Sequence, residues 1–215
     1  MNQPADHLMT GQSAEAQALA GDRPDIEAIA AWVKPDSTVL DLGCGDGLLL
    51  RYLKQTRNVR GYGVEISDER IIACVRNGVN VIQMNLEDGL QGFDAASFDC
   101  VILSQTLQAM RHTGEIVLDM LRVGHEAIVS FPNFGRWDRR AQVLFRGRMP
   151  VSEDLPYQWY DTPNLHLCTI DDFESYCAEK GIEVLERLVL HRGRPVTIWP
   201  NLFGSLAAYR IRKQR

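Results

Sequence analysis

The feature that most constrains the fold is a regular alternation of short apolar runs and helical segments between residues 38 and 131. The apolar runs predict strands at residues 38–42, 61–66, 79–84, 97–103 and 127–131. The segments between them predict helices at residues 48–54, 68–76 and 115–121. Strands joined by helices of this length need right-handed crossovers, which produce a parallel sheet covered by helices on both faces. Two later strands, at residues 182–190 and 206–211, complete a predicted seven-stranded, mostly parallel, doubly wound α/β sheet of Rossmann-like architecture.

The chain divides into a tail and one domain that carries an insertion. Residues 1–22 show no sustained apolar period and predict a flexible N-terminal tail. Residues 23–215 predict a single domain, since a chain of 215 residues supports one sizeable core. After the fifth strand, residues 132–167 form an aromatic- and arginine-rich insertion without a strand pattern. A helix follows it, because Thr169-Ile-Asp-Asp172 matches a capping box.

Composition narrows the class of protein. The net charge of −5 argues against general nucleic-acid binding, which requires phosphate neutralisation. No apolar run approaches the ~18 residues of a membrane span, and the N-terminus has no basic region before an apolar stretch. We therefore expect a cytoplasmic protein without a membrane association. The five cysteines form no CxxC pair, which indicates reduced thiols and no metal site.

The strongest chemical signal is the glycine-rich turn after the first strand, Val39-Leu-Asp-Leu-Gly-Cys-Gly-Asp-Gly47. Leu48 replaces the third glycine of a dinucleotide fingerprint, and the turn lacks the Gly-Lys-Ser/Thr of a P-loop. Asp41 and Asp46 flank the turn and repel phosphate, so they favour a ligand with a cationic amine. Glu65, at the end of the second strand, is placed to bind ribose hydroxyls. An amine and a ribose without phosphate describe S-adenosylmethionine; the alternative is a tight strand–helix turn with surface acids.

These segments resemble class I S-adenosylmethionine-dependent methyltransferases. The matching motifs are Asp41-Leu-Gly-Cys-Gly45, Gly61-Tyr-Gly-Val-Glu65 and Ser97-Phe-Asp-Cys-Val-Ile-Leu-Ser104. The resemblance implies the class I methyltransferase fold and S-adenosylmethionine or S-adenosylhomocysteine as the cofactor. It places Asp41 near the methionyl amine, Gly43 and Gly45 against the methionyl part, and Glu65 on the ribose.

The resemblance also extends the cofactor site and contains one departure. The further cofactor-binding residues that it implies are Asp46, Ile66, Asn85, Leu86 and Ser104. Asn85 stands where the family usually has an acid that meets the adenine amino group. Its amide oxygen accepts a hydrogen bond but carries no charge. A small shift would let Glu87 or Asp88 take this role.

The segments after the fourth and fifth strands do not identify a methyl acceptor. The loop at residues 104–108 offers hydroxyls and amides but no acid or histidine that could serve as a general base. The insertion carries five arginines, Arg136, Arg139, Arg140, Arg146 and Arg148. They favour a site for an acidic substrate or partner; the alternative is a solvated helix face answered by Glu153, Asp154 and Asp161. The aromatic loop at residues 156–166 is typical of a lid or an interface, or of a loop packed over the sheet edge.

A second resemblance is carried by the insertion and the segments beside it. The motifs Ser130-Phe-Pro-Asn-Phe-Gly135, Gly147-Arg-Met-Pro-Val-Ser152 and Leu155-Pro-Tyr-Gln-Trp-Tyr-Asp-Thr-Pro-Asn164 resemble the MetW family of methionine biosynthesis proteins. The resemblance runs from about Ile26 to Val189. It implies a methyltransferase fold that acts as a partner of the α/β-hydrolase-fold homoserine O-acyltransferase, with no methyl acceptor established for the family.

Two functional hypotheses follow. The first is an accessory subunit that supports homoserine O-acyltransferase. The second is an active S-adenosylmethionine-dependent methyltransferase with an unidentified small-molecule acceptor. For the first, the expected partner or substrate surface consists of Arg136, Trp137, Arg140, Tyr157, Trp159 and Tyr160. The sequence specifies neither a catalytic residue nor the oligomeric state.

Overall fold

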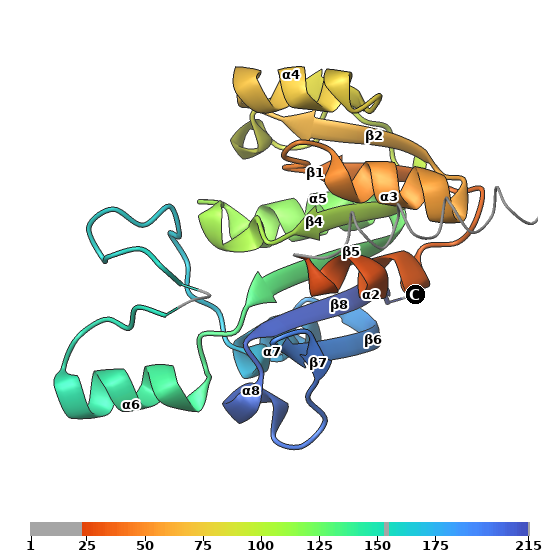
Figure 1. Ribbon diagram of the computed structural model, residues 1–215. Helices are drawn as coiled ribbons and strands as arrows, with labels where there is room; N and C mark the ends of the chain where they lie inside the picture. Colours follow the sequence, from red (N-terminus) through yellow and green to blue (C-terminus); the bar gives the residue numbers. More distant parts are fainter. Residues whose placement is uncertain (1–22, 153–154, 215) are drawn as a thin grey trace, which may run out of the picture.

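The computed structural model describes residues 23–152 and 155–214, which form one α/β body with a projecting arm (Figure 1). The tail expected at residues 1–22, together with Glu153 and Asp154, lies outside the described residues.

The centre of the molecule is one mixed sheet in the order β3-β2-β1-β4-β5-β8-β6-β7. Its strands are β1 (Thr38–Leu42), β2 (Arg60–Glu65), β3 (Asn80–Gln83), β4 (Phe98–Ser104), β5 (Gly124–Pro132), β6 (Ile182–His191), β7 (Arg194–Pro195) and β8 (Leu206–Lys213). The first five strands pair in parallel, and β8 joins β5 and β6 antiparallel. All seven predicted strands are therefore present in a mostly parallel sheet.

The eighth strand, β7, is a two-residue addition that the sequence pattern did not predict. It pairs with the end of β6 through a tight turn at Arg192 and Gly193, whose φ angles are 49° and 73°. Positive φ at both central residues is typical of a type I′ hairpin turn. Two residues are too short to show a strand periodicity, which explains the difference from the seven-stranded prediction.

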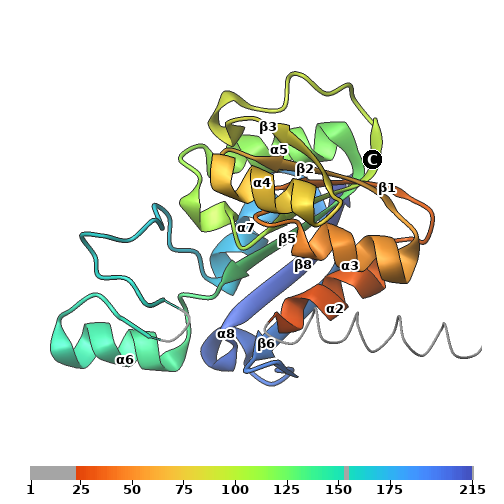
Figure 2. The ribbon, with the colours of Figure 1, turned by 45° about the horizontal axis from the view of Figure 1, so that its top comes forward.

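Helices cover both faces of the sheet (Figure 2). One face carries α2 (Pro24–Trp32), α3 (Leu48–Arg57) and α4 (Asp68–Arg76), and the other carries α5 (Thr113–Val123) and α7 (Ile170–Glu179). The central strands β1 and β4 are buried by both layers, which accounts for their mostly apolar residues, with Asp41 the exception inside β1. Thr169 begins α7 with the predicted capping box, in which Thr169 and Asp172 each bind the other's backbone N–H.

The insertion forms the projecting arm, defined here as residues 134–168 (Figure 1). Within it, α6 (Trp137–Arg146) is a helix that the strand and helix patterns did not predict. Its apolar residues Val143, Leu144 and Phe145 are consecutive and exposed, and its one buried residue is Arg139. Trp137, Ala141 and Leu144 recur at helical spacing, but this face is largely exposed, so the helix lacks the buried apolar stripe of a core helix.

Short elements complete the connections. They are η1 (Leu86–Asp88), η2 (Leu107–Ala109) and α8 (Pro200–Phe203). The strand order reverses between β1 and β4, so their carboxyl ends open a crevice, which is where open α/β sheets bind ligands.

Candidate cofactor site and projecting arm

The glycine-rich turn follows β1 and lies against the end of β2. The N–H groups of Gly43 and Cys44 both donate to the carbonyl of Val64, at 2.8 and 3.0 Å. Gly43 has a φ of 69°, and a Cβ at this position would lie 2.8 Å from Oγ1 of Thr106 in the loop after β4. Only glycine allows these two loops to approach so closely.

Glu65 holds the turn in place from the end of β2. Its Oε2 accepts the N–H of Gly45 at 3.0 Å, and its Oε1 accepts the N–H groups of Ile66 and Ser67 at 2.9 and 3.0 Å. The guanidinium of Arg70 lies 3.9 Å from Oε2. A carboxylate has about four lone-pair sites, so three backbone bonds leave capacity for a ligand hydroxyl.

Asp41 is the most unusual group at this edge. Its side chain is buried, with 2% of the residue exposed, and no described residue donates a hydrogen bond to its carboxylate. Burial raises the pKa of the Asp41 carboxyl from 3.8 to about 7, with a smaller contribution of the same sign from Glu65 and an opposing one from Arg23. A buried carboxyl without a donor is costly for the fold, and a cationic ligand would compensate it.

A network that the sequence did not predict borders Asp41. Asp25, at the start of α2, is almost fully buried and accepts both Nε and Nη2 of Arg23, at 2.9 and 2.8 Å. Oγ of Ser104 accepts Nη2 of Arg23 and donates to Asp25, and Nε2 of Gln105 also donates to Asp25. An acid in a helix's first turn is a common sequence pattern, so nothing local indicated that Asp25 reaches the end of β4.

A pocket of about 180 Å³ adjoins the turn on the β2–β3 side. Of the predicted cofactor residues, it is lined by Gly43, Glu65, Ile66, Asn85 and Leu86. Oδ1 of Asn85 accepts the N–H of Glu87 at 3.1 Å, so its accepting atom is shared with the start of η1. Met84, Glu87, Thr106 and Met110 also line the pocket, and of these the sequence motifs indicate Glu87 alone.

The remaining predicted cofactor residues lie around the pocket and do not line it. Asp41 is in β1 just before the turn, Gly45 is in the turn, and Ser104 belongs to the Arg23 network. Asp46 is exposed, and its Oδ1 accepts the N–H of Leu48 at 3.1 Å, which caps the beginning of α3. The structure therefore gives Asp46 a capping contact and gives Ser104 a positioning contact.

The loops on the acceptor side contain no ordered acid–base pair among the described residues. Gln105 has a φ of 52° and is fixed by hydrogen bonds to Ser130. His112 is exposed and makes no capping hydrogen bond to α5. His166 lies where the arm segment returns to the body, and its Nε2 approaches the carbonyl of Arg111 at 3.2 Å. Neither histidine lines the pocket beside Glu65.

The base of the arm is built around Asn133, which is fully buried. Its Nδ2 donates to the carbonyls of Asn201 and Gly204, and its Oδ1 accepts the N–H groups of Gly135 and Ile170. Arg139 is also fully buried and donates to the carbonyl of Asn133. The hypothesis of a uniformly solvated arginine face therefore does not hold for the first half of α6.

Other residues of the predicted partner surface are divided between base and tip. Arg136 is largely buried, pairs with Asp138 and approaches Nε2 of His191 at 3.2 Å. Arg140 is exposed, and its Nε donates to the carbonyl of Gly135. Trp137 and Tyr157 are about half exposed, whereas Trp159 and Tyr160 are 74% and 71% exposed and contact each other edge to face.

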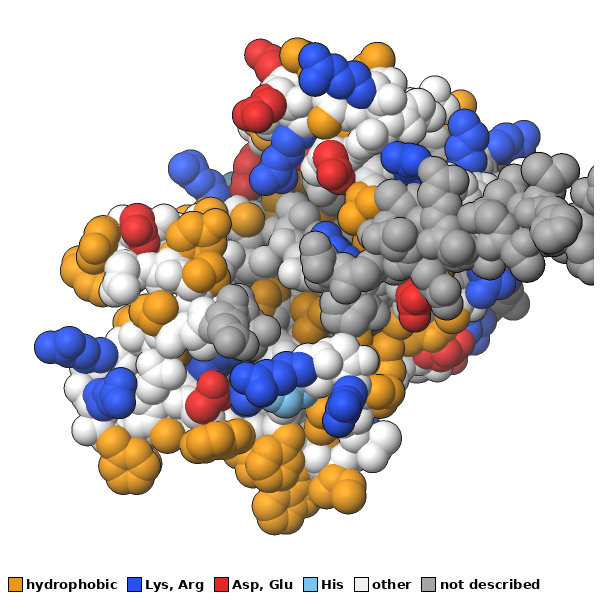
Figure 3. Space-filling model, viewed as in Figure 1, with side chains coloured by type: hydrophobic (Ala, Val, Ile, Leu, Met, Phe, Trp, Pro, Cys, Tyr) orange, Lys and Arg blue, Asp and Glu red, His pale blue; other side chains and the backbone are white. Residues whose placement is uncertain are grey.

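Figure 3 shows hydrophobic side chains gathered over the arm and, separately, at the bottom of the view over α8. On the arm, the exposed apolar residues of α6 and the following loop are Trp137, Val143, Leu144, Phe145, Met149 and Val151. Phe145 is 80% exposed. Exposed apolar surface of this extent, presented on a projection, is typical of a protein–protein contact.

The part of the chain that the structure describes offers neither a metal cluster nor a membrane-spanning helix. No group of three or more His, Cys, Asp or Glu side chains among them is arranged to hold a metal ion. None of the helices within residues 23–152 and 155–214 has the length and apolar character needed to cross a membrane.

The sequence matches the family described as methionine biosynthesis protein MetW over residues 23–211. It is 35% identical, over 173 residues, to the bifunctional methionine biosynthesis protein MetXA/MetW of Rhodopirellula baltica. The match covers 76% of this chain and 28% of that relative, so the chain spans little more than a quarter of the relative's length.

Solved structures resemble the fold at low sequence identity. A Thermotoga maritima S-adenosylmethionine-dependent methyltransferase, described as a possible histamine N-methyltransferase, has a TM-score of 0.65 at 16% identity, with 95% of this chain and 96% of that chain covered. The magnesium protoporphyrin IX methyltransferase of Synechocystis, solved with bound S-adenosylhomocysteine, has a TM-score of 0.64 at 16% identity, with 91% and 84% covered. The predicted class I methyltransferase fold is confirmed.

Proposed function

The chain belongs to the MetW family of methionine biosynthesis proteins, and we propose that it binds S-adenosylmethionine or S-adenosylhomocysteine and supports a homoserine O-acyltransferase as a partner subunit. The observation that carries the partner is the Rhodopirellula relative, which joins MetXA and MetW in one bifunctional protein. Two activities joined in one chain are held at high effective concentration. We place this function in the cytoplasm, since all five cysteines are free thiols.

The acidic residues around the glycine-rich turn match the positively charged amine and the ribose hydroxyls of the proposed cofactor. Asp41 would hold the methionyl amine, because it is a buried carboxyl to which no residue in the described part of the chain donates. Glu65 would hold the ribose, and Asn85 and Leu86 lie where the base would reach. S-adenosylmethionine, when bound, supplies an activated methyl group, whereas S-adenosylhomocysteine does not.

The size of the pocket also bears on this proposal. Its volume of about 180 Å³ is below the 300–1,000 Å³ of typical small-molecule sites, so it would hold part of the cofactor. The methionyl part would lie beyond it, toward Asp41. Thr106 stands against Gly43 on that route, and we expect its side chain to turn when the cofactor binds.

The acceptor side favours a binding role over methyl transfer by this chain. Ser104 and Gln105 are committed to Asp25, and no described acid or histidine lines the cofactor pocket on that side. Glu87 lines the pocket on its η1 side, where its Oε1 accepts the N–H of Arg111. Methyl transfer to an unidentified small molecule is the second candidate. Such a transfer needs a general base when the acceptor atom carries a proton of high pKa, and it can proceed without one otherwise.

Glu65→Ala should weaken the binding of S-adenosylhomocysteine by about 1.5–3 kcal/mol, the range for hydrogen bonds to a charged group. Calorimetric titration measures the change. Because Glu65 also accepts three backbone N–H groups, the melting temperature of the variant must be recorded beside its affinity. Asn85→Asp is the matched comparison, and its affinity should equal or exceed that of the parent. Unchanged binding by a folded Glu65→Ala protein would show that the ribose lies elsewhere.

The exposed surface of the arm, from the start of α6 to the aromatic loop, is where the partner would dock. Interface anchors are enriched in Trp, Tyr and Arg, and the arm presents Trp137, Arg140, Tyr157, Trp159 and Tyr160. Arg136 supports this surface from below through its contacts with Asp138 and His191. The arm projects from the body, so its apolar tip is accessible to a second protein (Figure 1).

Trp159→Ala should weaken association with the acyltransferase by about 2 kcal/mol or more if this ring is an anchor. Arg140→Glu should mainly slow association and reduce its salt dependence. Surface plasmon resonance at two salt concentrations separates the two effects. Val75→Ala on α4, a comparably exposed apolar residue outside the arm, is the control. If both arm variants bind the acyltransferase as the parent does and instead lose the cofactor, the arm is a lid over the active site.

The function as a whole is tested by homoserine acylation. The acyltransferase is assayed alone, with this chain, and with this chain plus S-adenosylmethionine or S-adenosylhomocysteine. We expect the chain to raise acyltransferase activity and to form a complex with the enzyme. Absence of both effects, with methyl transfer to an added small molecule, would favour the second candidate.

A further inference from the structure

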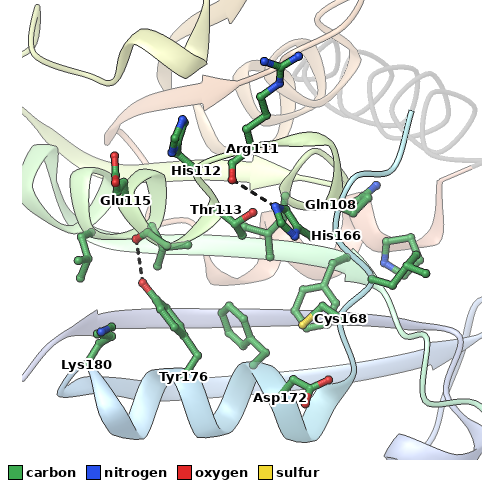
Figure 4. Close-up of a pocket in the computed structure, with 18 residues that line it drawn as sticks. Gln108, Arg111, His112, Thr113, Glu115, His166, Cys168, Asp172, Tyr176 and Lys180 are labelled. Atoms are coloured by element: carbon green, nitrogen blue, oxygen red, sulfur yellow. Dashed lines mark hydrogen bonds between the residues drawn. The ribbon is translucent and has the colours of Figure 1, made fainter. Parts of the chain in front are cut away.

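A second cavity, of about 610 Å³, lies between α5 and α7 (Figure 4). It is distinct from the cofactor pocket, because η2 stands between them. Leu107 and Gln108 line the larger cavity, whereas Thr106 and Met110 line the smaller one. We propose that the larger cavity binds an amphiphilic carboxylate, with its aliphatic chain inside and its carboxylate at the rim beside Arg111.

The interior of the cavity fits an apolar chain. Leu107, Val117, Phe131 and Phe173 form its inner wall, and each is buried in the folded chain. Leu118 and Leu167 line the cavity yet are each more than two-fifths exposed, so its mouth is apolar as well. A volume of 610 Å³ is within the range that holds small-molecule ligands.

Several polar side chains that line the cavity already form hydrogen bonds with backbone carbonyls of neighbouring segments. Tyr176 Oη donates to the carbonyl of Gly114 at 2.8 Å, and Nε2 of His166 approaches the carbonyl of Arg111 at 3.2 Å (Figure 4). Oγ1 of Thr113 donates to the carbonyl of Met110 at 3.1 Å. These contacts brace α5 against α7 and the arm. They leave the body of a ligand to be held mainly by apolar contact.

The charges at the rim favour an anion at one end. The carboxylate of Asp172 is occupied by the capping box, and Lys180 pairs with Glu179 at 2.9 Å. Arg111 forms no ion pair with a described residue and extends outward from the rim (Figure 4). It stands just before the first turn of α5, whose N-terminal N–H groups carry partial positive charge. Glu115 lies in this same first turn and also lines the cavity, but its carboxylate, like the guanidinium of Arg111, is directed to the outside (Figure 4).

The test uses hexanoate, octanoate and decanoate as probes, with 1-octanol and octylamine as uncharged and cationic comparisons. We expect saturable binding of one octanoate per chain by calorimetry. Two methylene groups should change Kd by about fifteenfold until the chain fills the cavity, since each buried methylene contributes about 0.8 kcal/mol. Octanoate should bind more tightly than 1-octanol or octylamine.

Cys168 provides a readout of position. It lines the cavity and is the one cysteine of the five that is not buried. Burial nevertheless raises the pKa of its thiol to about 12, so its alkylation is slow enough to follow by mass spectrometry. Saturating octanoate should slow the alkylation of Cys168 at least fivefold.

Two variants and one control complete the experiment. Gly114→Leu places a side chain in the cavity beside Tyr176, and it should abolish octanoate binding. Arg111→Gln should weaken octanoate about fivefold and leave 1-octanol unchanged. Arg76→Gln, an exposed arginine on α4 at the opposite face of the sheet, should change neither.

The proposal is overturned if octanoate neither binds nor protects Cys168 in the parent protein. Equal affinities for octanoate and 1-octanol would overturn the assignment of an anion. Loss of acyltransferase binding in Gly114→Leu, without ligand binding in the parent, would instead make the cavity a protein-docking groove.

Discussion

At pH 8, the Asp41→Asn protein should have a free energy of unfolding about 4 kcal/mol larger than that of the wild type. The Asp41 carboxyl has a pKa of about 7 in the folded chain, mainly because of burial, against 3.8 for the exposed group. Each unit of pKa difference corresponds to 1.36 kcal/mol of stability. The wild type therefore carries a penalty at pH 8 that the neutral amide avoids.

The sign of this effect gives it a characteristic pH profile. Between pH 4 and 7 the folded state holds a proton on Asp41 that the unfolded state has released, so the stability of the wild type falls as pH rises. Urea unfolding of both proteins between pH 4 and 9 measures the difference. It should be close to zero at pH 4, grow through pH 7 and then remain constant. A difference that does not vary with pH would show that Asp41 does not titrate in this range.

Asp25→Asn is the matched control at a neighbouring buried acid. Burial raises the pKa of Asp25, but its hydrogen bond and ion pair with Arg23 outweigh this, and the net pKa is lowered. Its contribution is therefore present at neutral pH and lost as pH falls below about 4. Asp25→Asn should destabilise the protein at pH 7, opposite in sign to Asp41→Asn.

The gain in stability should be accompanied by a loss of ligand binding. If the methionyl amine pairs with Asp41, the asparagine variant loses a charge-assisted hydrogen bond and should bind S-adenosylhomocysteine at least tenfold more weakly. Functional sites often carry such locally unfavourable groups. A variant that is more stable and binds as tightly as the parent would place the amine elsewhere.

The sheet and the glycine-rich turn were predictable because their signals are local. The strands β1 and β4 are mostly apolar, with Asp41 the one acid inside β1, and the capping box before α7 is a four-residue pattern. Glu65 was predictable because the end of β2 must lie beside the turn after β1 in a parallel sheet. Its triple contact with backbone N–H groups was not, since these contacts depend on the turn's conformation.

The features that the sequence left open depend on distant contacts. The arginines of the arm share one composition, yet Arg139 is buried at the base whereas Arg140 is exposed. Asp25 and Ser104 are 79 residues apart and meet only because α2 packs beside the end of β4. The cavity between α5 and α7 has no motif, because a cavity is defined by how helices are spaced and not by residue order.

Four elements of the fold meet at the side chain of Asn133. Its amide binds α8 and the loop before β8 through the carbonyls of Asn201 and Gly204, at 3.0 and 2.9 Å. It also accepts the N–H of Gly135 in the arm at 2.9 Å and that of Ile170 in α7 at 3.4 Å. The position is fully buried, so water cannot replace these contacts.

Asn133→Ala should therefore lower the free energy of unfolding by about 4 kcal/mol, since each hydrogen bond contributes about 1 kcal/mol and buried groups are left unpaired. Urea unfolding measures the loss. Asn133→Asp should be at least as destabilising, because it removes both donors and directs a carboxylate at two carbonyls. Asn80→Ala, at an exposed asparagine with one side-chain hydrogen bond of 3.4 Å, should cost less than about 0.5 kcal/mol.

The arm should also loosen in Asn133→Ala, and trypsin should cleave it faster at Arg146 and Arg148, both of which are exposed. A loss below 1 kcal/mol with unchanged proteolysis would mean that the arm is held by its other contacts, Arg139 foremost among them.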